Sequence, residues 1–351
     1  MATLIASNQS AVFIETQTTL GTFVDAAATG TAIRVVGTPT WAVRGAGIID
    51  RKEIYTPWGG NSSSRTGGLG WDITFQTEFF WEFDGNYDVT LSNQTQLAAL
   101  WLSSPWAITH PTLETQLAVQ PFFQPDVNRT ITTYAVQPFS MVYEEEYGKR
   151  WEAFDCVALP KFSWEYGQRV MIDWTIKGSW RPVVDSQNIQ PTYVPPASQP
   201  PIIGVNCAVA FSGLTVGIDA VSKVTIDTGW TLNDVGDFRK ADGFGISFFR
   251  QDASPSIELD INELPETDGA ASPVDVQPGW TDAEENIIGT SLTLTMTVGS
   301  SAWTILLANP QYVAFPTQGG ETNGYRTNTS KWQAIPSDST SPLTFTMTTS
   351  N

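Results

Sequence analysis

Apolar and polar residues alternate along several stretches of this chain, and that alternation constrains its fold more than any other feature. Between Val170 and Ile176 every second residue is a large apolar one, while Asp173 and Thr175 lie between them. Residues 292–298 repeat the pattern with threonine in the intervening positions. Residues 71–76 begin in the same way. Because successive side chains of a β-strand point to opposite faces, each stretch is predicted to be a strand with one buried face.

Helical patterns are scarce and short. One helix is predicted over residues 95–102, because Asn93 can cap it and Pro105 stops it. A second is predicted over residues 282–288, where a capping box opens the segment and Gly289 closes it. Both segments lie among predicted strands, so the chain is expected to be mainly β with one short helix in each half.

The clearest candidate boundary is the proline-rich stretch at residues 191–201. Its prolines favour an extended, semi-rigid spacer. We therefore predict two domains, residues 1–190 and residues 202–351. No crisp sequence repeat relates them, but both contain several strands and one short helix, which permits a duplicated fold without requiring it.

Composition favours a protein that buries much of its surface against other protein. Charged residues make up 15% of the 351 residues, below the roughly 25% of an ordinary soluble domain. The net charge is −18, with 12 basic and 19 acidic residues in positions 1–195 and 6 basic and 17 acidic residues in positions 196–351. Neither half can neutralise nucleic-acid phosphates, so specific DNA binding is not expected. An acidic wall would instead repel DNA and let it slide past.

The sequence patterns offer no catalytic constellation. His110 is the single histidine, which excludes a His-rich metal site, and no nucleophile motif accompanies it. The glycine-rich residues 57–71 lack the Gly-Lys-Ser/Thr ending of a phosphate-binding loop, and a strand pattern follows them. We therefore expect no enzyme activity, no metal and no cofactor, and interpret His110 as a structural or surface residue.

Cysteines and acidic clusters have structural interpretations. Cys156 and Cys207 are far apart and form no CxxC motif, so both are interpreted as small buried hydrophobic residues rather than as a disulfide framework. The glutamates at 144–146 are predicted to form a charged hairpin tip. The acidic residues between 219 and 268 match no calcium loop and are expected to form a solvated or channel-facing surface.

Tryptophans are expected in two settings. Trp174 and Trp303 lie in alternating or apolar runs and are predicted to be core residues. Three others lie next to glycine or in turns and are better candidates for contacts at an interface: Trp58, Trp180 and Trp230. The N-terminal apolar stretch has no basic region before it, and no apolar run is long enough to span a bilayer. We therefore expect the protein to fold in a cytoplasm and not to associate with a membrane.

Three stretches together resemble the two-domain tail tube proteins of long-tailed bacteriophages (siphophages). Residues 15–27, ETQTTLGTFVDAA, resemble the opening of that family, in which a Glu-Thr-rich stretch and a Gly-Thr precede small residues. Residues 131–180 resemble its middle section, a strand and hairpin leading into a strongly alternating strand. Residues 305–316, with an Asn-Pro turn before a strand, resemble its late section.

The resemblance implies a structural virion protein of the phage tail, assembled in the host cytoplasm. It implies two tandem tail-tube-like β-sandwich or β-barrel domains. Subunits would join sheets edge to edge into rings, and stacked rings would form the tube through which DNA leaves the capsid without specific binding. The implied partners are other copies of the chain, as a trimeric pseudo-hexamer or a hexamer, and the tail terminator, tail-tip and tape-measure proteins. Another β-rich virion protein, such as a capsid decoration, neck or carbohydrate-binding tail-tip protein, is the alternative.

The long glycine-rich loop at residues 57–70 is the candidate contact between subunits or between rings. The residues predicted to make this contact are Trp58, Gly59, Gly60, Asn61, Arg65, Gly67 and Gly68. Long loops inside compact domains are often functional, and reaching another subunit is the role that suits a tube. The residues that line the DNA channel cannot be named from the sequence; alternate polar and acidic strand positions are the expected source.

Overall fold

The computed structural model describes the strands and the connections next to them. The described residues are 10–33, 35–45, 48–51, 63–66, 69–78, 99–100, 103–104, 106–109, 116–121, 137–145, 148–185, 207–211, 221–234, 248–251, 254–262, 291–298, 301–322, 325–335 and 343–349.

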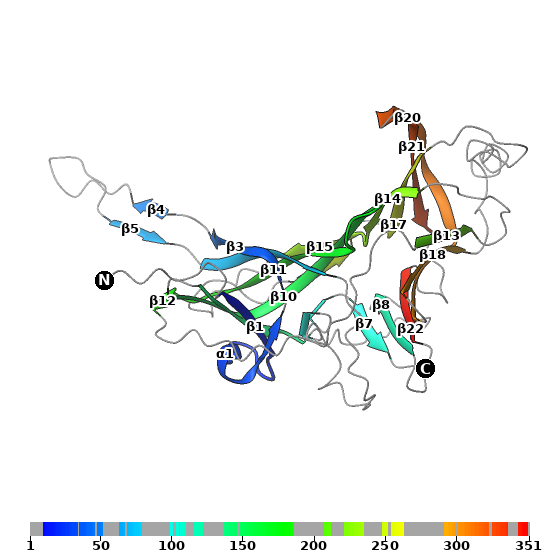
Figure 1. The fold of residues 1–351 in the computed structure, drawn as a ribbon. Coiled ribbons are helices and arrows are strands. Elements are labelled where there is room, and N and C mark those ends of the chain that lie inside the picture. Colours follow the sequence, from blue (N-terminus) through cyan, green and yellow to red (C-terminus); the bar gives the residue numbers. More distant parts are fainter. Residues whose placement is uncertain are drawn as a thin grey trace, which may run out of the picture.

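Two large antiparallel sheets and two small ribbons contain the described strands (Figure 1). The twelve-stranded sheet contains β1 (Ala11–Thr16), β2 (Thr31–Ile33), β3 (Val36–Gly45), β6 (Leu69–Glu78), β9 (Phe139–Glu144), β10 (Lys149–Glu165), β11 (Met171–Trp180), β12 (Val184–Asp185), β14 (Val221–Asp227), β17 (Ser256–Asn262), β20 (Pro310–Thr322) and β21 (Tyr325–Ala334). The six-stranded sheet contains β7 (Trp106–Thr109), β8 (Gln116–Pro121), β13 (Cys207–Phe211), β18 (Ser291–Val298), β19 (Ser301–Ala308) and β22 (Leu343–Thr349). The ribbons pair β4 (Ile48–Arg51) with β5 (Ser63–Thr66) and β15 (Trp230–Asn233) with β16 (Phe248–Gln251). The mainly β fold predicted from the alternation is therefore confirmed.

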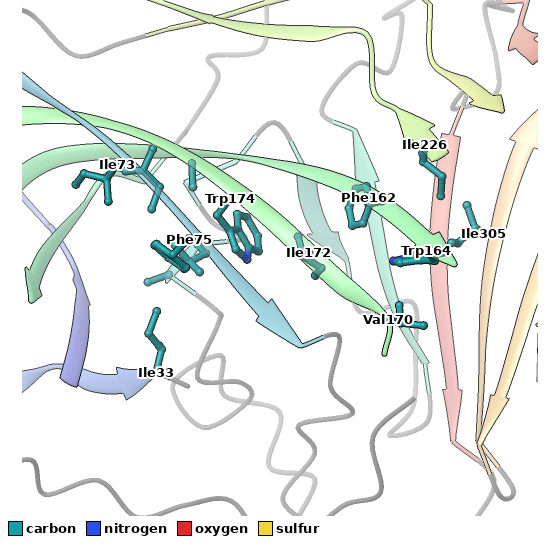
Figure 2. Packing of buried hydrophobic residues seen from close by; sticks show 14 of the residues in the cluster. Ile33, Ile73, Phe75, Phe162, Trp164, Val170, Ile172, Trp174, Ile226 and Ile305 are labelled. Carbon is teal, nitrogen blue, oxygen red and sulfur yellow. The ribbon is translucent and has the colours of Figure 1, made fainter. Parts of the chain in front are cut away.

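The alternating stretches form strands whose apolar positions are buried. Ile172, Trp174 and Ile176 of β11 are buried, and Thr175 between them is exposed. β6 follows the same pattern, and in β18 Leu292 and Leu294 are buried while Thr293 and Thr295 between and after them are partly exposed. Figure 2 shows such residues from β6, β10 and β11 gathered on one side of the twelve-stranded sheet. One apolar face per strand is thus the main source of hydrophobic stabilisation.

The helical prediction was only partly matched. Of the predicted 95–102 helix, the structure describes Ala99 and Leu100, which are helical and buried. The predicted 282–288 helix lies outside the described residues. A four-residue helix that the sequence did not signal, α1 (Ala26–Thr29), follows Asp25, whose carboxylate accepts a hydrogen bond from the Ala27 N–H at 3.1 Å. Ala26 packs with Phe13 and Val142 on the face of β1 and β9 that lies away from the main core.

Strand β10 changes the parity of its buried residues at Asp155. Before this residue Ala153 points into the core, whereas after it Cys156, Ala158 and Phe162 do. Asp155 has φ +49° and lies where the pairing of β10 with both β9 and β11 shifts register. A β-bulge of this kind adds one residue and so returns the apolar side chains of a long strand to the core face.

Eight strands form one continuous antiparallel run, in the order β3-β6-β11-β10-β14-β17-β21-β20. Its first four strands, β3, β6, β11 and the C-terminal part of β10, are called here the first quartet. Its last four, β14, β17, β21 and β20, are called the second quartet. In each quartet the order of strands across the sheet is the first, second, fourth and third of the four along the chain. The two quartets therefore share one topology.

The strands that cover the quartets repeat as well. In the first half β1 pairs with β9, β9 with the N-terminal part of β10, and that part with β12. In the second half β13 pairs with β18, β18 with β19, and β19 with β22. Asp155 separates the two parts of β10, and Asn309, with φ +45°, separates β19 from β20. A two-stranded ribbon also follows the first strand of each quartet. The order of strand pairing therefore repeats between the two halves of the described chain, whereas the two-domain fold stays a prediction.

Both large sheets combine strands from the two sides of residues 191–201. β10 pairs with β14 in the larger sheet, and β8 pairs with β22 in the smaller one. Figure 2 shows the consequence, because Phe162 and Trp164 of β10, Ile226 of β14 and Ile305 of β19 belong to one hydrophobic cluster. The proline-rich stretch itself lies outside the described residues, and the division at 190/202 stays a prediction.

The β10 bulge generates a stability prediction. The Asp155 carboxylate accepts hydrogen bonds from the Gly21 N–H at 2.8 and 3.1 Å and from Gln17 Nε2 at 3.3 Å, while the Asp155 N–H donates to Gln17 Oε1 at 2.7 Å. Replacing Asp155 with Ala should lower the free energy of unfolding by about 2–4 kcal/mol, because the Gly21 N–H loses its carboxylate acceptor, the buried Gln17 amide keeps only the Thr22 carbonyl, and alanine is strained at this positive φ. Asp155→Asn, which tolerates that φ, should cost less. Urea unfolding measures both; equal midpoints for wild type and Asp155→Ala would refute the role given to the bulge.

Candidate assembly surface

One face of the eight-stranded run is polar wherever its side chains are described, in both quartets. It carries the side chains that alternate with the core residues, among them Thr74 and Gln76 on β6, Thr175 on β11 and Lys161 on β10, all of which are exposed. Gln76 Nε2 donates a hydrogen bond to Asp173 Oδ1 at 2.6 Å across β6 and β11. A sheet with one apolar and one polar face is suited to covering a core on one side and facing water on the other.

Acids and bases are interleaved on this polar face. The described charged residues at its positions are Asp72, Asp173, Glu165, Asp227, Glu258, Asp260, Arg44, Lys161, Lys177, Lys223 and Lys331. Several are direct cross-strand neighbours, such as Lys161 and Asp173, Glu165 and Lys223, or Glu258 and Lys331. Opposite charges at such positions stabilise a sheet modestly. The described part of this face is therefore close to neutral, although the chain as a whole carries −18.

The two quartets join at a short antiparallel seam between β10 and β14. Four residue pairs form it, from Phe162 opposite Ile226 to Glu165 opposite Lys223. Lys223 Nζ lies 3.6 Å from Glu165 Oε1, and the Tyr166 N–H donates to the Ser222 carbonyl at 2.8 Å. The seam continues both faces of the sheet, because Phe162 and Ile226 are buried on the apolar side while Ser163 and Thr225 lie on the polar side.

The outer strands of the run, β3 and β20, each pair along one edge only within the described part of the chain. β3 pairs with β6, and β20 pairs with β21. Val36 and Val43 of β3 are 38% and 59% exposed, so this ten-residue edge also presents apolar side chains. An unpaired edge of this length is a site for adding another strand. Since all eight strands alternate in direction, β3 of a second copy added to β20 would continue the antiparallel order.

Three tryptophans pack together on the first half of the chain. Trp41 of β3, Trp71 of β6 and Trp151 of β10 have ring centroids 5.5–5.9 Å apart, with edge-on or tilted geometry. Such aromatic contacts add about 0.5–1.5 kcal/mol per pair beyond burial. The cluster ties the edge strand β3 to the interior, so this edge is held firmly although one side of it is unpaired.

The ribbon of the second half lies across the polar face of the first quartet. β15 contacts β10, and Trp230 and Leu232 of β15 are buried. Asp234, directly after β15, forms an ion pair with Arg44 of β3 and lies 3.4 Å from Lys177 Nζ of β11. Gly70 leaves room for the guanidinium, because a β-carbon at that position would come within 2.6 Å of Arg44 Nη2. In Figure 1, β15 overlies β10 and β11, whereas β4 and β5 extend away from both sheets.

A charged cluster fixes α1 to the first half. Glu152, which is buried, is held by Arg150 Nε at 2.8 Å and by Arg181 Nε at 2.9 Å, and Arg150 also pairs with Asp25 at the start of α1. Glu144 lies within β9 and is buried, so it is not part of the hairpin tip that the sequence predicted for residues 144–146. Desolvation raises its pKa, and Arg150 only partly offsets that effect. After β9, the Gly148 N–H donates to the Glu145 carbonyl at 3.0 Å, and Gly148 has φ +74°.

Most of the loop residues predicted to contact other subunits lie outside the described residues. They are Trp58, Gly59, Gly60, Asn61, Gly67 and Gly68. Arg65 is placed in β5, opposite Ile49 of β4. The predicted loop therefore includes one strand of a ribbon. Its role in contacting other subunits stays a prediction.

The other singled-out residues have varied outcomes. Trp174 is buried, and its indole N–H donates to Thr77 Oγ1 at 2.9 Å. Trp180 is half-buried against the main core and Trp230 is buried; an interface role for either stays a prediction. Cys156 is buried, as predicted, and burial raises the pKa of its thiol. His110, Trp58 and the side chains of Trp303 and Cys207 lie outside the description.

Comparison with known proteins leaves the chain without a family assignment. No family model matches it, and no curated protein matches it significantly. Among the described residues, no helix is long and apolar enough to cross a membrane.

The ion pairs of Asp234 generate the next prediction. Asp234→Lys should lower the free energy of unfolding by about 1–3 kcal/mol, because a lysine at this position would face the largely buried Arg44 and also Lys177 with a like charge, although Arg44 keeps Asp72 at 3.7 Å. The exposed pair of Asp185 and Lys149 provides a matched control, and Asp185→Lys should leave stability nearly unchanged. Urea unfolding of both variants tests the difference. Equal stability of the two variants would show that Asp234 does not hold the ribbon.

Proposed function

We propose that copies of this chain join edge to edge into rings, and that stacked rings form the tail tube of a long-tailed bacteriophage, the conduit for DNA. The observation that carries the proposal is the β10·β14 seam. It joins two quartets of the same topology through the last strand of one and the first strand of the next.

The same junction can be made between two chains. β20 of one copy occupies the position in its quartet that β10 occupies in the first quartet, and β3 of another copy corresponds to β14. Pairing β20 with β3 would give each edge the backbone partner that it lacks within the described chain. A head-to-tail contact of this kind closes into a ring when its rotation returns on itself. Three chains would then place six quartets around a channel.

The polar face of the quartets supports the channel role. Where the ribbons leave this face exposed, its interleaved acids and bases offer hydrated, nearly neutral protein to a passing DNA backbone and give phosphates no continuous basic strip to bind. The acidic residues elsewhere in the chain add a general repulsion. A structural, non-enzymatic role follows from this proposal.

Self-assembly of the purified full-length chain tests the proposal. Negative-stain microscopy should show hollow cylinders of uniform diameter. Replacing both Val36 and Val43 with Lys should abolish the cylinders, because charges on an edge strand oppose strand addition. Circular dichroism should show that the variant remains folded, since both side chains are already more than a third exposed.

Leu20→Lys is the matched control, because Leu20 is 55% exposed and lies outside the edge strands. It should still form cylinders. A wild-type chain that stays monomeric, or that binds capsids or glycans without polymerising, would contradict the tube and favour a decoration, neck or tail-tip protein. Cylinders formed by the double Lys variant would contradict the role of the β3 edge.

A further inference from the structure

We infer that the β4–β5 ribbon of one copy lies across the polar face of the second quartet of the neighbouring copy in the same ring. This inference rests on the proposed ring. It names a contact surface that edge pairing alone does not require, since the ribbon would reach past the joined edges onto β20 and β21 of its neighbour.

The second half of the chain supplies the template for this contact. β15 follows β14 after two residues. It lies over the quartet that β14 joins, where it contacts β10. Beyond β15, Asp234 reaches Lys177 on β11 and Arg44 on β3. The ribbon thus binds the polar face on the far side of the seam.

The first half carries the same parts in the same order. β4 follows β3 after two residues, and β5 leads into β6, as β16 leads into β17. Among the described strands of its own chain, however, β3 joins no further quartet, and in Figure 1 β4 and β5 extend beyond the end of β3, apart from both large sheets. If β3 pairs with β20 of a neighbour as β14 pairs with β10, the ribbon is carried over that neighbour's β20 and β21.

The receiving surface has a counterpart of the residue that holds β15. Lys177 is the seventh residue of the ten in β11, and Lys331 is the seventh of the ten in β21. Both lie on the polar face opposite an acid of the adjoining strand, Asp72 for Lys177 and Glu258 for Lys331. Lys177 also binds Asp234, whereas Lys331 forms no ion pair with the described residues. The sequence of β4 contains one acid, Asp50.

Chemical crosslinking of assembled protein tests the contact. The variant with Asp50→Cys and Lys331→Cys, treated with a short bis-maleimide reagent, should lose most of its monomer band on a denaturing gel and give dimers and larger species. The matched control combines Asp50→Cys with Lys177→Cys, whose position in the first quartet is already occupied by the chain's own β15. It should stay monomeric, as should treated wild type, which reports on the native cysteines.

Microscopy of the same samples separates the two proposals. Cylinders in which the Asp50/Lys331 variant remains uncrosslinked would overturn the ribbon contact and leave the tube intact. A crosslink that forms only within one chain, visible as a shifted monomer band, would also overturn it. Absence of any assembly by the wild-type chain would overturn the ring and this contact together. Equal crosslinking of the control would show that the ribbon does not select the second quartet.

Discussion

The structure depends on keeping one apolar face in register across eight antiparallel strands. A strand that slipped by one residue would turn its core side chains to the polar side. Asp155 shows how strictly this is held, because it inserts one residue in β10 and thereby returns Cys156, Ala158 and Phe162 to the core side. Its carboxylate also accepts a hydrogen bond from the Gly21 N–H. The bulge at Asp155 therefore fixes the segment that leads into α1. The corresponding residue of the second half, Asn309, separates β19 from β20.

A sheet built in this way ends in two different edge strands, and a further strand can be added at either edge. Within the chain the β10·β14 seam satisfies one such pair of edges and continues both faces of the sheet. The ribbon of the second half then crosses the seam and binds Arg44 and Lys177 through Asp234. The same parts recur at the ends of the chain, as β3, its ribbon and β20. Repetition of one junction, first within a chain and then between chains, is the simplest physical reason for duplicating a quartet.

Strand positions could be predicted from the sequence where burial decides them. Two strands could be predicted because their apolar residues alternate with polar ones on a half-buried sheet. These residues are Trp71, Ile73 and Phe75 in β6 and Ile172, Trp174 and Ile176 in β11. The parity change around Asp155 could not be read in the same way, because apolar residues stand at both odd and even positions there, as with Ala153 and Phe154 or Val157 and Ala158. The β10·β14 seam could not be predicted either, since four residue pairs between distant segments leave no local pattern. α1 is too short to show a period, and the burial of Glu144 depends on the fold around Arg150 and Asp25.

The central claim is that copies join as the two halves of one chain do. Cryo-electron microscopy of the assembled protein tests it most directly, because strand pairing at the subunit boundary becomes visible. The account predicts a continuous antiparallel sheet around the channel, with β20 of one copy beside β3 of the next and the polar face turned to the lumen. Rings held together through other surfaces, with the β3 and β20 edges unpaired, would contradict it.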